Sequence, residues 1–208
     1  MSHPGLCGWT PGDLSWTELP PTPTPIEDAV AVGWRDRWLV VVSGWSDGAN
    51  TDATQVFDPL AGAWATWEPF PGTAVFGATG ALDDDTLVLV DGVADTAGFP
   101  LVHQTWAGHF RDGGVDREEL ADHPGPARYR AAGGSLAGAV FVGGADRAYN
   151  YDGRAYADGS AAEPIGSVLR AGRLSVRAPA QRPSARCRAG SHCCTRSSAP
   201  RSVASPGA

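Results

Sequence analysis

A short phrase of apolar and acidic residues recurs three times along the chain, at a spacing of about fifty residues. It reads Trp16–Pro20 (WTELP), then Trp67–Pro71 (WEPFP), and more loosely Glu119–Pro124 (ELADHP). After each phrase come two apolar stretches joined by a turn, and the second stretch ends in a glycine: Gly44, Gly92 and Gly144. A repeat of this length predicts an all-β fold in which each copy forms one small antiparallel sheet.

Each copy contains apolar stretches suited to the four antiparallel strands of a β-propeller blade. The strands predicted for the first copy are 28–33, 38–44, 53–58 and 63–68. Those of the second copy are 76–82, 86–91, 103–110 and 115–121. Those of the third copy are 129–136, 139–144, 148–152 and 154–157. No fourth copy begins after Ile165, so the sequence predicts an incomplete ring.

The charge and composition of the chain change abruptly after Ile165. All 23 acidic residues and all eight tryptophans precede this point, so residues 1–165 have a net charge of −15 and residues 166–208 one of +8. The second segment is rich in Arg, Ala, Ser and Pro, a composition that buries too little apolar surface to fold. We therefore predict an N-terminal extension at 1–13, propeller blades at 14–165 and a disordered basic tail at 166–208.

Two interpretations of this basic tail compete. One is a frameshifted or run-on translation of GC-rich DNA, and the other is an arm whose arginines bind nucleic acid or another anionic surface. The first is favoured because the third copy is cut off before the tail begins, and nucleic acid is accordingly not an expected partner. The N-terminus lacks the features of a signal peptide and no stretch is long enough to span a membrane, which predicts a soluble chain but not its compartment.

Three groups of residues resemble metal ligands at first sight. The three carboxylates of 83–85 lie at a predicted hairpin tip, where successive side chains diverge, so a solvated turn is favoured over a calcium site. His103 and His109 share one face of a strand by parity, but packing or solvent exposure is favoured over a metal pair. The adjacent residues 192–194 (HCC) lack a second, spaced pair. The sequence therefore predicts no metal and no cofactor.

The ends of the second strands carry a further pattern. They read Ser43-Gly44, Asp91-Gly92 and Gly143-Gly144, and the phrases VFDP, with Phe57-Asp58, and Tyr151-Asp152-Gly153 follow in the first and third copies. With these motifs residues 14–165 resemble kelch repeats of the galactose oxidase-like propeller superfamily, and residues 125–164 are similar to bacterial kelch proteins. The resemblance implies an all-β, kelch-type β-propeller fragment of about three four-stranded antiparallel blades, followed by the disordered tail.

This resemblance also bears on stability and on cofactors. Complete propellers have more than three blades, so the walls of the first and last blades are expected to be open to water and to permit self-association through their edges. Galactose oxidase holds copper with tyrosines, histidines and a crosslinked cysteine, and no residues of this chain match those positions. Copper chemistry is therefore not expected.

Candidate ligand-binding residues lie in the third copy. The loops that join strand 4 to the next strand 1, and strand 2 to strand 3, emerge on one face of a propeller, and Arg128, Arg130, Arg147 and Asn150 fall at or beside that face. Arginine forks suit a planar carboxylate, such as that of an acidic sugar or an acidic peptide side chain. The alternative is that these arginines form ion pairs within the protein, with Asp122, Asp146 or Asp152.

The sequence leaves three functions open. The first is a noncatalytic module that binds a protein or a carbohydrate across one propeller face. The second, equally favoured, is an inactive, truncated fragment of such a module. The alternative is a carbohydrate-active enzyme resembling the kelch-type sialic-acid (N-acetylneuraminate) epimerases, with the arginines holding the substrate carboxylate. No catalytic residue is indicated, so an enzyme is the less favoured class.

Overall fold

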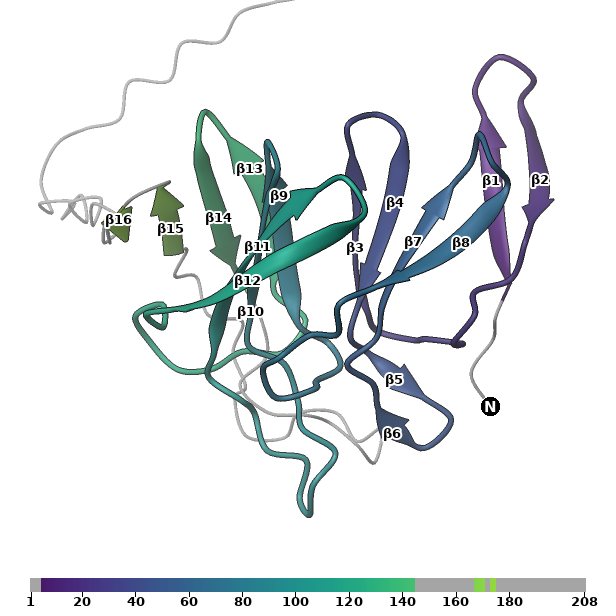
Figure 1. Cartoon of the computed structure of the whole chain (residues 1–208). Coiled ribbons are helices and arrows are strands. Elements are labelled where there is room, and N and C mark those ends of the chain that lie inside the picture. The colour runs from purple at the N-terminus through teal and green to yellow at the C-terminus, as the bar shows by residue number, and fades with distance from the viewer. Residues whose placement is uncertain (1–4, 145–166, 171–172, 175–208) are drawn as a thin grey trace, which may run out of the picture. The chain divides into compact units, whose positions relative to one another are not determined.

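The computed structural model describes residues 5–144, 167–170 and 173–174, and all of its regular elements are β-strands (Figure 1). The chain divides into two compact units, Met1–Ala178 and Pro179–Ala208, and the second lies outside the described residues. Within the first unit are three four-stranded antiparallel sheets and two short hairpins. No helix that could cross a membrane occurs among the described residues.

The first two sheets follow the sequence repeat closely. Sheet order in the first is β3 (Val30–Trp34), β4 (Trp38–Val42), β7 (Thr54–Asp58) and β8 (Ala63–Trp67). In the second it is β9 (Thr79–Asp83), β10 (Thr86–Val90), β11 (Thr105–Arg111) and β12 (Gly114–Leu120). In both sheets, strands neighbouring in sequence are neighbours in space, as in a propeller blade. The eight strands predicted for these two copies are confirmed to within three residues at each end.

The third sheet differs from the prediction in its outer half. Its inner strands β13 (Ala132–Leu136) and β14 (Ala139–Gly143) confirm the predicted ones, and β14 pairs with β15 (Ser167–Arg170), which pairs with β16 (Arg173–Leu174). The outer strands predicted at 148–152 and 154–157 lie outside the described residues. Strands β15 and β16 come from beyond Ile165, where the sequence predicts the blades to end, so the boundary at residue 165 remains a prediction.

The innermost strands of the three sheets are neighbours, with β9 between β3 and β13 (Figure 1). An ideal Cβ at Gly80 of β9 would lie 2.6 Å from a Val30 methyl group, and one at Gly133 of β13 would lie 2.7 Å from the Gly80 carbonyl oxygen. Only residues without a side chain permit strands to approach this closely. This stacking of inner strands is that of successive propeller blades, so the fold is a β-propeller fragment.

The core lies between the blades and is divided by the second sheet. Leu87 and Leu89 of β10 pack toward the first sheet, against a cluster that includes Trp34 and Phe110. Val88 and Val90, which point to the opposite face, pack against Val140 and Val142 of the third sheet. Strand β10 is therefore buried on both faces, which explains why it is apolar throughout rather than alternating.

The tips of the first and second blades are joined by Trp34 and Asp85. The buried indole Nε1 of Trp34 donates to Asp85 Oδ1 at 2.6 Å, and the Arg35 guanidinium forms two further bonds to this carboxylate, at 3.0 and 3.1 Å. These bonds hold the pKa of Asp85 below its usual range. Asp85 belongs to the predicted acidic tip, and it serves as a contact between blades.

The first hairpin consists of β1 (Leu6–Thr10) and β2 (Ser15–Leu19), a two-stranded sheet. Strand β2 contains most of the first copy of the repeated phrase. The second and third copies begin at the ends of β8 and β12, the outermost strands of their sheets. The hairpin thus corresponds to the outer half of a blade, and the predicted extension 1–13 contains one of its strands. Trp9 and Trp16, cross-strand partners, are 46% and 72% exposed.

Backbone hydrogen bonds connect the three blades just before their inner strands begin. The Gly77 N–H donates to the Asp28 carbonyl and the Arg130 N–H donates to the Gly77 carbonyl, both at 2.9 Å. All three residues have positive φ, with values of 51°, 63° and 54°. A Cβ at Gly77 would overlap the ring of Tyr129, which is buried. Glycine is therefore required in the second blade for two independent reasons.

We expect Gly77→Ala to destabilise the protein more than Gly62→Ala. Both glycines have φ near 60°, so alanine at either costs about 1–2 kcal/mol of backbone strain. Gly62 has no neighbouring atom within 4 Å of an added Cβ, whereas Gly77 faces the Tyr129 ring, which adds about 1–3 kcal/mol of overpacking. Urea unfolding followed by tryptophan fluorescence measures the difference. Equal midpoints for the two variants would contradict this account of the blade junction.

Candidate functional site

The loops expected to carry ligand-binding residues lie at one end of the sheets, below the strands in Figure 1. This end carries the small hairpin of β5 (Trp45–Ser46) and β6 (Ala49–Asn50) and the loop 93–102. Asn50 ties the two loops together, because its side-chain amide donates to the carbonyls of Ala74 and Val93 at 2.8 and 2.9 Å. The loop surface is thus fixed by hydrogen bonds between blades.

An aromatic cluster packs against these loops. Phe76, Val93 and Tyr129 form its buried part, and Trp45 and Phe99 pack against them. Phe76 stacks edge-on to Trp45 and to Tyr129, with centroid distances of 5.5 and 5.9 Å. Such edge-to-face contacts favour one orientation of each ring. Tyr129 is therefore held in place next to the blade junction.

Arg130, one of the predicted binding residues, is exposed at this junction. Its Nη2 donates to Asp28 Oδ2 at 2.6 Å, and its guanidinium carbon lies 4.8 Å from the centre of the Tyr129 ring. The Arg130 side chain is 59% exposed and that of Asp28 is 32% exposed. The Tyr129 hydroxyl also contacts Asp28 Oδ2, at 3.4 Å. We call Asp28, Tyr129 and Arg130 the axial cluster, because each lies just before an innermost strand.

The other predicted binding residues fall elsewhere. Arg128 is 2% exposed, and its backbone N–H donates to Asp91 Oδ2 at 3.0 Å. Arg147 and Asn150 lie outside the described residues, as do Asp146 and Asp152, two of the expected intramolecular partners. Arg130 forms an ion pair within the protein, as the alternative interpretation expected, but its partner is Asp28 from the first copy.

A buried pair, Asp91 and His123, lies beside Arg128 and was not predicted. Asp91 is 1% exposed and follows β10, and His123 is 3% exposed and follows β12. His123 Nε2 lies 2.6 Å from Asp91 Oδ2, and His123 Nδ1 lies 3.1 Å from the Pro124 carbonyl oxygen. The second carboxylate oxygen, Asp91 Oδ1, is buried and has no hydrogen-bond partner among the described residues.

The surroundings of His123 favour its protonated form. Both ring nitrogens face oxygen acceptors, and only an imidazolium donates from both. Burial by itself lowers the pKa of His123, but the hydrogen bond and the charge of Asp91 outweigh it, so the pKa lies above its usual value. When His123 is protonated, the two side chains form a buried ion pair.

The first copy of the repeat has other residues at the positions of Asp91 and His123. Asp91 and Ser43 are equivalent, because both have positive φ and both accept a backbone N–H from the loop entering the next blade, from Arg128 and Val75 respectively. His123 takes the place of Phe70, since the phrases Phe70-Pro71 and His123-Pro124 align. The sequence signal for this site was therefore a histidine at a repeat position that is apolar in the preceding copy.

A third side chain, that of His103, lies next to this pair. Its ring packs edge-on to the ring of His123 with centroids 4.6 Å apart, and its Nε2 lies 3.0 Å from the His123 carbonyl oxygen. Asp91, His103 and His123 each offer one ligand atom within 4.8 Å of the other two, the one such grouping among the described residues. His109, predicted to share a face with His103, is exposed like His103 and contacts Thr86 and Glu118.

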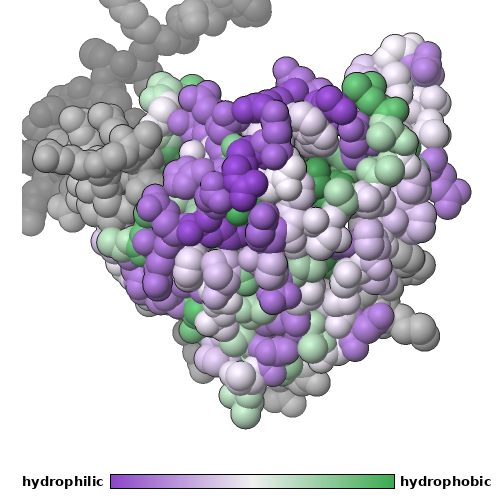
Figure 2. Space-filling model, in the orientation of Figure 1, coloured by the Kyte–Doolittle hydropathy of each residue, from purple (hydrophilic) through white to green (hydrophobic). Residues whose placement is uncertain are grey.

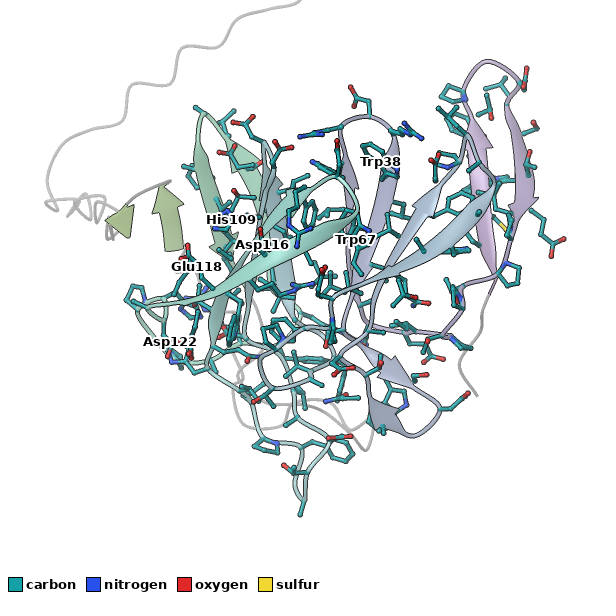
Figure 3. The ribbon with its side chains drawn as sticks, in the orientation of Figure 1. Trp38, Trp67, His109, Asp116, Glu118 and Asp122 are labelled. Carbon is teal, nitrogen blue, oxygen red and sulfur yellow. The ribbon has the colours of Figure 1, made fainter. Side chains whose placement is uncertain are left out.

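The outer surface of the second blade is hydrophilic, as Figure 2 shows over the part of this view where β11 and β12 lie. His109, Asp116 and Glu118 are labelled along this hairpin in Figure 3, and Asp122 lies at its far end, toward the loops. Arg111 pairs with Asp116 at 2.9 Å, and His109 with Glu118 at 3.2 Å. Because these charges are exposed and locally paired, we interpret this surface as solvated rather than as a binding site.

The comparisons with known proteins agree with the fold and go no further. No protein-family model matches the chain, and no curated protein matches it. The solved structure titled "Structure of YjhT" is similar, with a TM-score of 0.62 and 14% sequence identity over 82% of this chain. This is a likeness of fold alone. The chain spans 62% of the YjhT chain, so it corresponds to part of that structure.

We expect Asp91 and His123 to be strongly coupled in stability. Asp91→Ser and His123→Phe install the residues of the preceding copy, and His123→Phe alone leaves a buried carboxylate without its counter-charge. Each single change is expected to cost about 3–5 kcal/mol, and the double variant much less than their sum. Urea unfolding of the four proteins gives the coupling energy. Additive losses would contradict a direct interaction.

The same four proteins test the charge of His123. A pKa raised on folding means that the stabilisation is fully present below the ordinary histidine pKa, near 6.5, and is lost as pH rises through the folded-state value. The wild type is therefore expected to lose stability relative to the double variant as pH rises above about 6.5. A difference that does not change with pH would show that His123 is neutral in the folded protein.

Proposed function

We propose that the chain is part of a noncatalytic propeller module that binds a carboxylate-bearing ligand, an acidic sugar or an acidic peptide side chain, at the axial cluster. The observation that carries this proposal is Arg130, whose exposed guanidinium lies over Tyr129 at the start of an innermost strand. In propellers this position is close to the central axis, where loops of several blades surround a ligand.

The axial cluster has the properties of a pre-organised anion site. Tyr129 is buried and held by aromatic contacts, so it fixes the plane on which the Arg130 guanidinium lies. Asp28 takes one end of that guanidinium, at Nη2. A planar fork of this kind matches the two oxygens of a carboxylate. Ligand binding would then compete with Asp28 for a guanidinium that is already oriented.

The other predicted residues enter this proposal with different roles. Arg128 is buried, so we propose that it contributes to the positive potential beneath the loops rather than touching the ligand. Arg147 and Asn150 stay proposals as ligand contacts. The chain spans 62% of the YjhT chain, and the binding experiment below distinguishes a chain that binds on its own from an inactive fragment.

The enzymatic alternative, a carbohydrate-active enzyme resembling kelch-type sialic-acid epimerases, has one observation in its favour. Asp91 and His123 combine a base and an acid in one hydrogen bond, at the loop end of the blades. Both side chains are buried, however, and a general acid or base must reach its substrate within hydrogen-bond distance. We therefore place binding before catalysis.

Arg130→Ala is expected to weaken the binding of N-acetylneuraminic acid at least tenfold, since a charge-assisted hydrogen bond contributes about 1.5–3 kcal/mol. Asp28→Asn is expected to tighten it, because the competing carboxylate is removed while asparagine tolerates the positive φ. Isothermal titration calorimetry with the free acid and with its methyl ester distinguishes carboxylate recognition from general sugar binding. An acidic peptide provides the second probe.

Arg37→Ala is the matched control for Arg130→Ala. Arg37 also pairs with an aspartate at 2.6 Å, Asp58, and also lies over an aromatic ring, that of Trp38 at 4.5 Å, but it lies at the β3–β4 hairpin tip. Its replacement is expected to leave binding unchanged. Equal effects of the two substitutions, or none from Arg130→Ala, would exclude the axial cluster as the ligand site.

A further inference from the structure

We propose that Asp91, His103 and His123 form a binding site for a divalent transition metal, with Zn²⁺ as the best-suited ion. The proposal concerns the loop end of the second blade and is independent of the carboxylate site at the axial cluster. Two imidazoles and one carboxylate make a donor set that zinc, and less selectively cobalt and nickel, accept.

The first argument is the spacing of the three ligand atoms. They lie within 4.8 Å of one another, while three ligands around one tetrahedral zinc ion lie roughly 3.4 Å apart at metal–ligand distances near 2.1 Å. The longest separation must therefore close by up to about 1.4 Å. His103 is the exposed member, so its side chain has the freedom to make that movement.

The second argument is the orientation of His123. A histidine that binds a metal through one ring nitrogen almost always donates the N–H of the other to a carbonyl or carboxylate oxygen. His123 Nδ1 faces the Pro124 carbonyl oxygen at 3.1 Å, which leaves Nε2 directed at Asp91. Binding of a metal ion at Nε2 would displace the proton there, and the 2.6 Å separation between Nε2 and Asp91 Oδ2 must open by about 0.8 Å to admit the ion.

The third argument is the buried oxygen of Asp91. Oδ2 is fixed by the Arg128 backbone N–H at 3.0 Å and by His123, whereas Oδ1 has no hydrogen-bond partner among the described residues. A carboxylate oxygen that is fully buried without a partner costs free energy, and a coordinated cation removes that cost. Asp91 therefore offers a ligand atom that folding alone leaves unsatisfied.

The fourth argument comes from the preceding copy of the repeat. There the same backbone is built with Ser43 and Phe70, both buried, so the fold itself does not require an aspartate and a histidine at these places. An ionisable pair that packing does not need is a candidate for chemistry. His103, the third residue of the group, lies in the same blade, just before β11.

The experiment is calorimetric titration of the full chain with Zn²⁺, and absorption spectroscopy with Co²⁺, after removal of metals with a chelator. The wild type is expected to bind one ion that depends on His103, and Co²⁺ is expected to give a visible ligand-field band. His103→Ala removes an exposed ligand and so leaves the core intact. It is expected to weaken this binding at least about tenfold.

His109→Ala is the matched control, because it removes an exposed histidine of the same blade and leaves His192, Cys193 and Cys194 unchanged. Any metal bound by those C-terminal residues is therefore the same in both variants. Thermal unfolding with and without Zn²⁺ provides a second readout, since an ion that binds only the folded state raises its stability. Metal affinity or thermal stabilisation that is equal in His103→Ala and His109→Ala would overturn the proposal.

Discussion

The second sheet is covered on both of its faces, and most features of the chain depend on that. Strand β10 presents leucines to one neighbouring sheet and valines to the other, so it contributes to two cores at once. In the first sheet, Val40 and Val42 of β4 are fully buried in the core shared with the second sheet, while Leu39 and Val41 on the opposite face are half-buried. The double coverage fixes the spacing of the sheets and, with it, the position of every loop discussed above.

The repeat was sufficient to predict the three sheets, but not all of their strands. A period near fifty residues, alternation within the strands and terminal glycines placed β3, β4, β7 to β12, β13 and β14 correctly. Gly44 and Gly92 illustrate why, since both have positive φ and an added Cβ would meet the chain entering the same blade. The outer strands predicted at 148–152 and 154–157 lie outside the described residues, and β15 was not predicted because it lies in a segment whose composition argues against any strand.

Less of the candidate site was predictable, for a different reason. Arg130 was found by its residue type and loop position, but its partner Asp28 lies 102 residues earlier, and the backbone of Gly77 is hydrogen-bonded to both residues. Asp91 and His123 are 32 residues apart and come together through the packing of two loops. Periodicity describes single strands, whereas these contacts depend on how the blades stack.

The equivalence of Ser43 with Asp91 and of Phe70 with His123 has a consequence for how such proteins change over generations. Internal duplication supplies each structural position more than once, and one copy is enough to keep a neighbouring interface closed. A second copy can then tolerate a destabilising polar substitution, because the loss of stability is confined to one pair of blades. The repeat thereby separates the residues that maintain a scaffold from those in which new chemistry first arises.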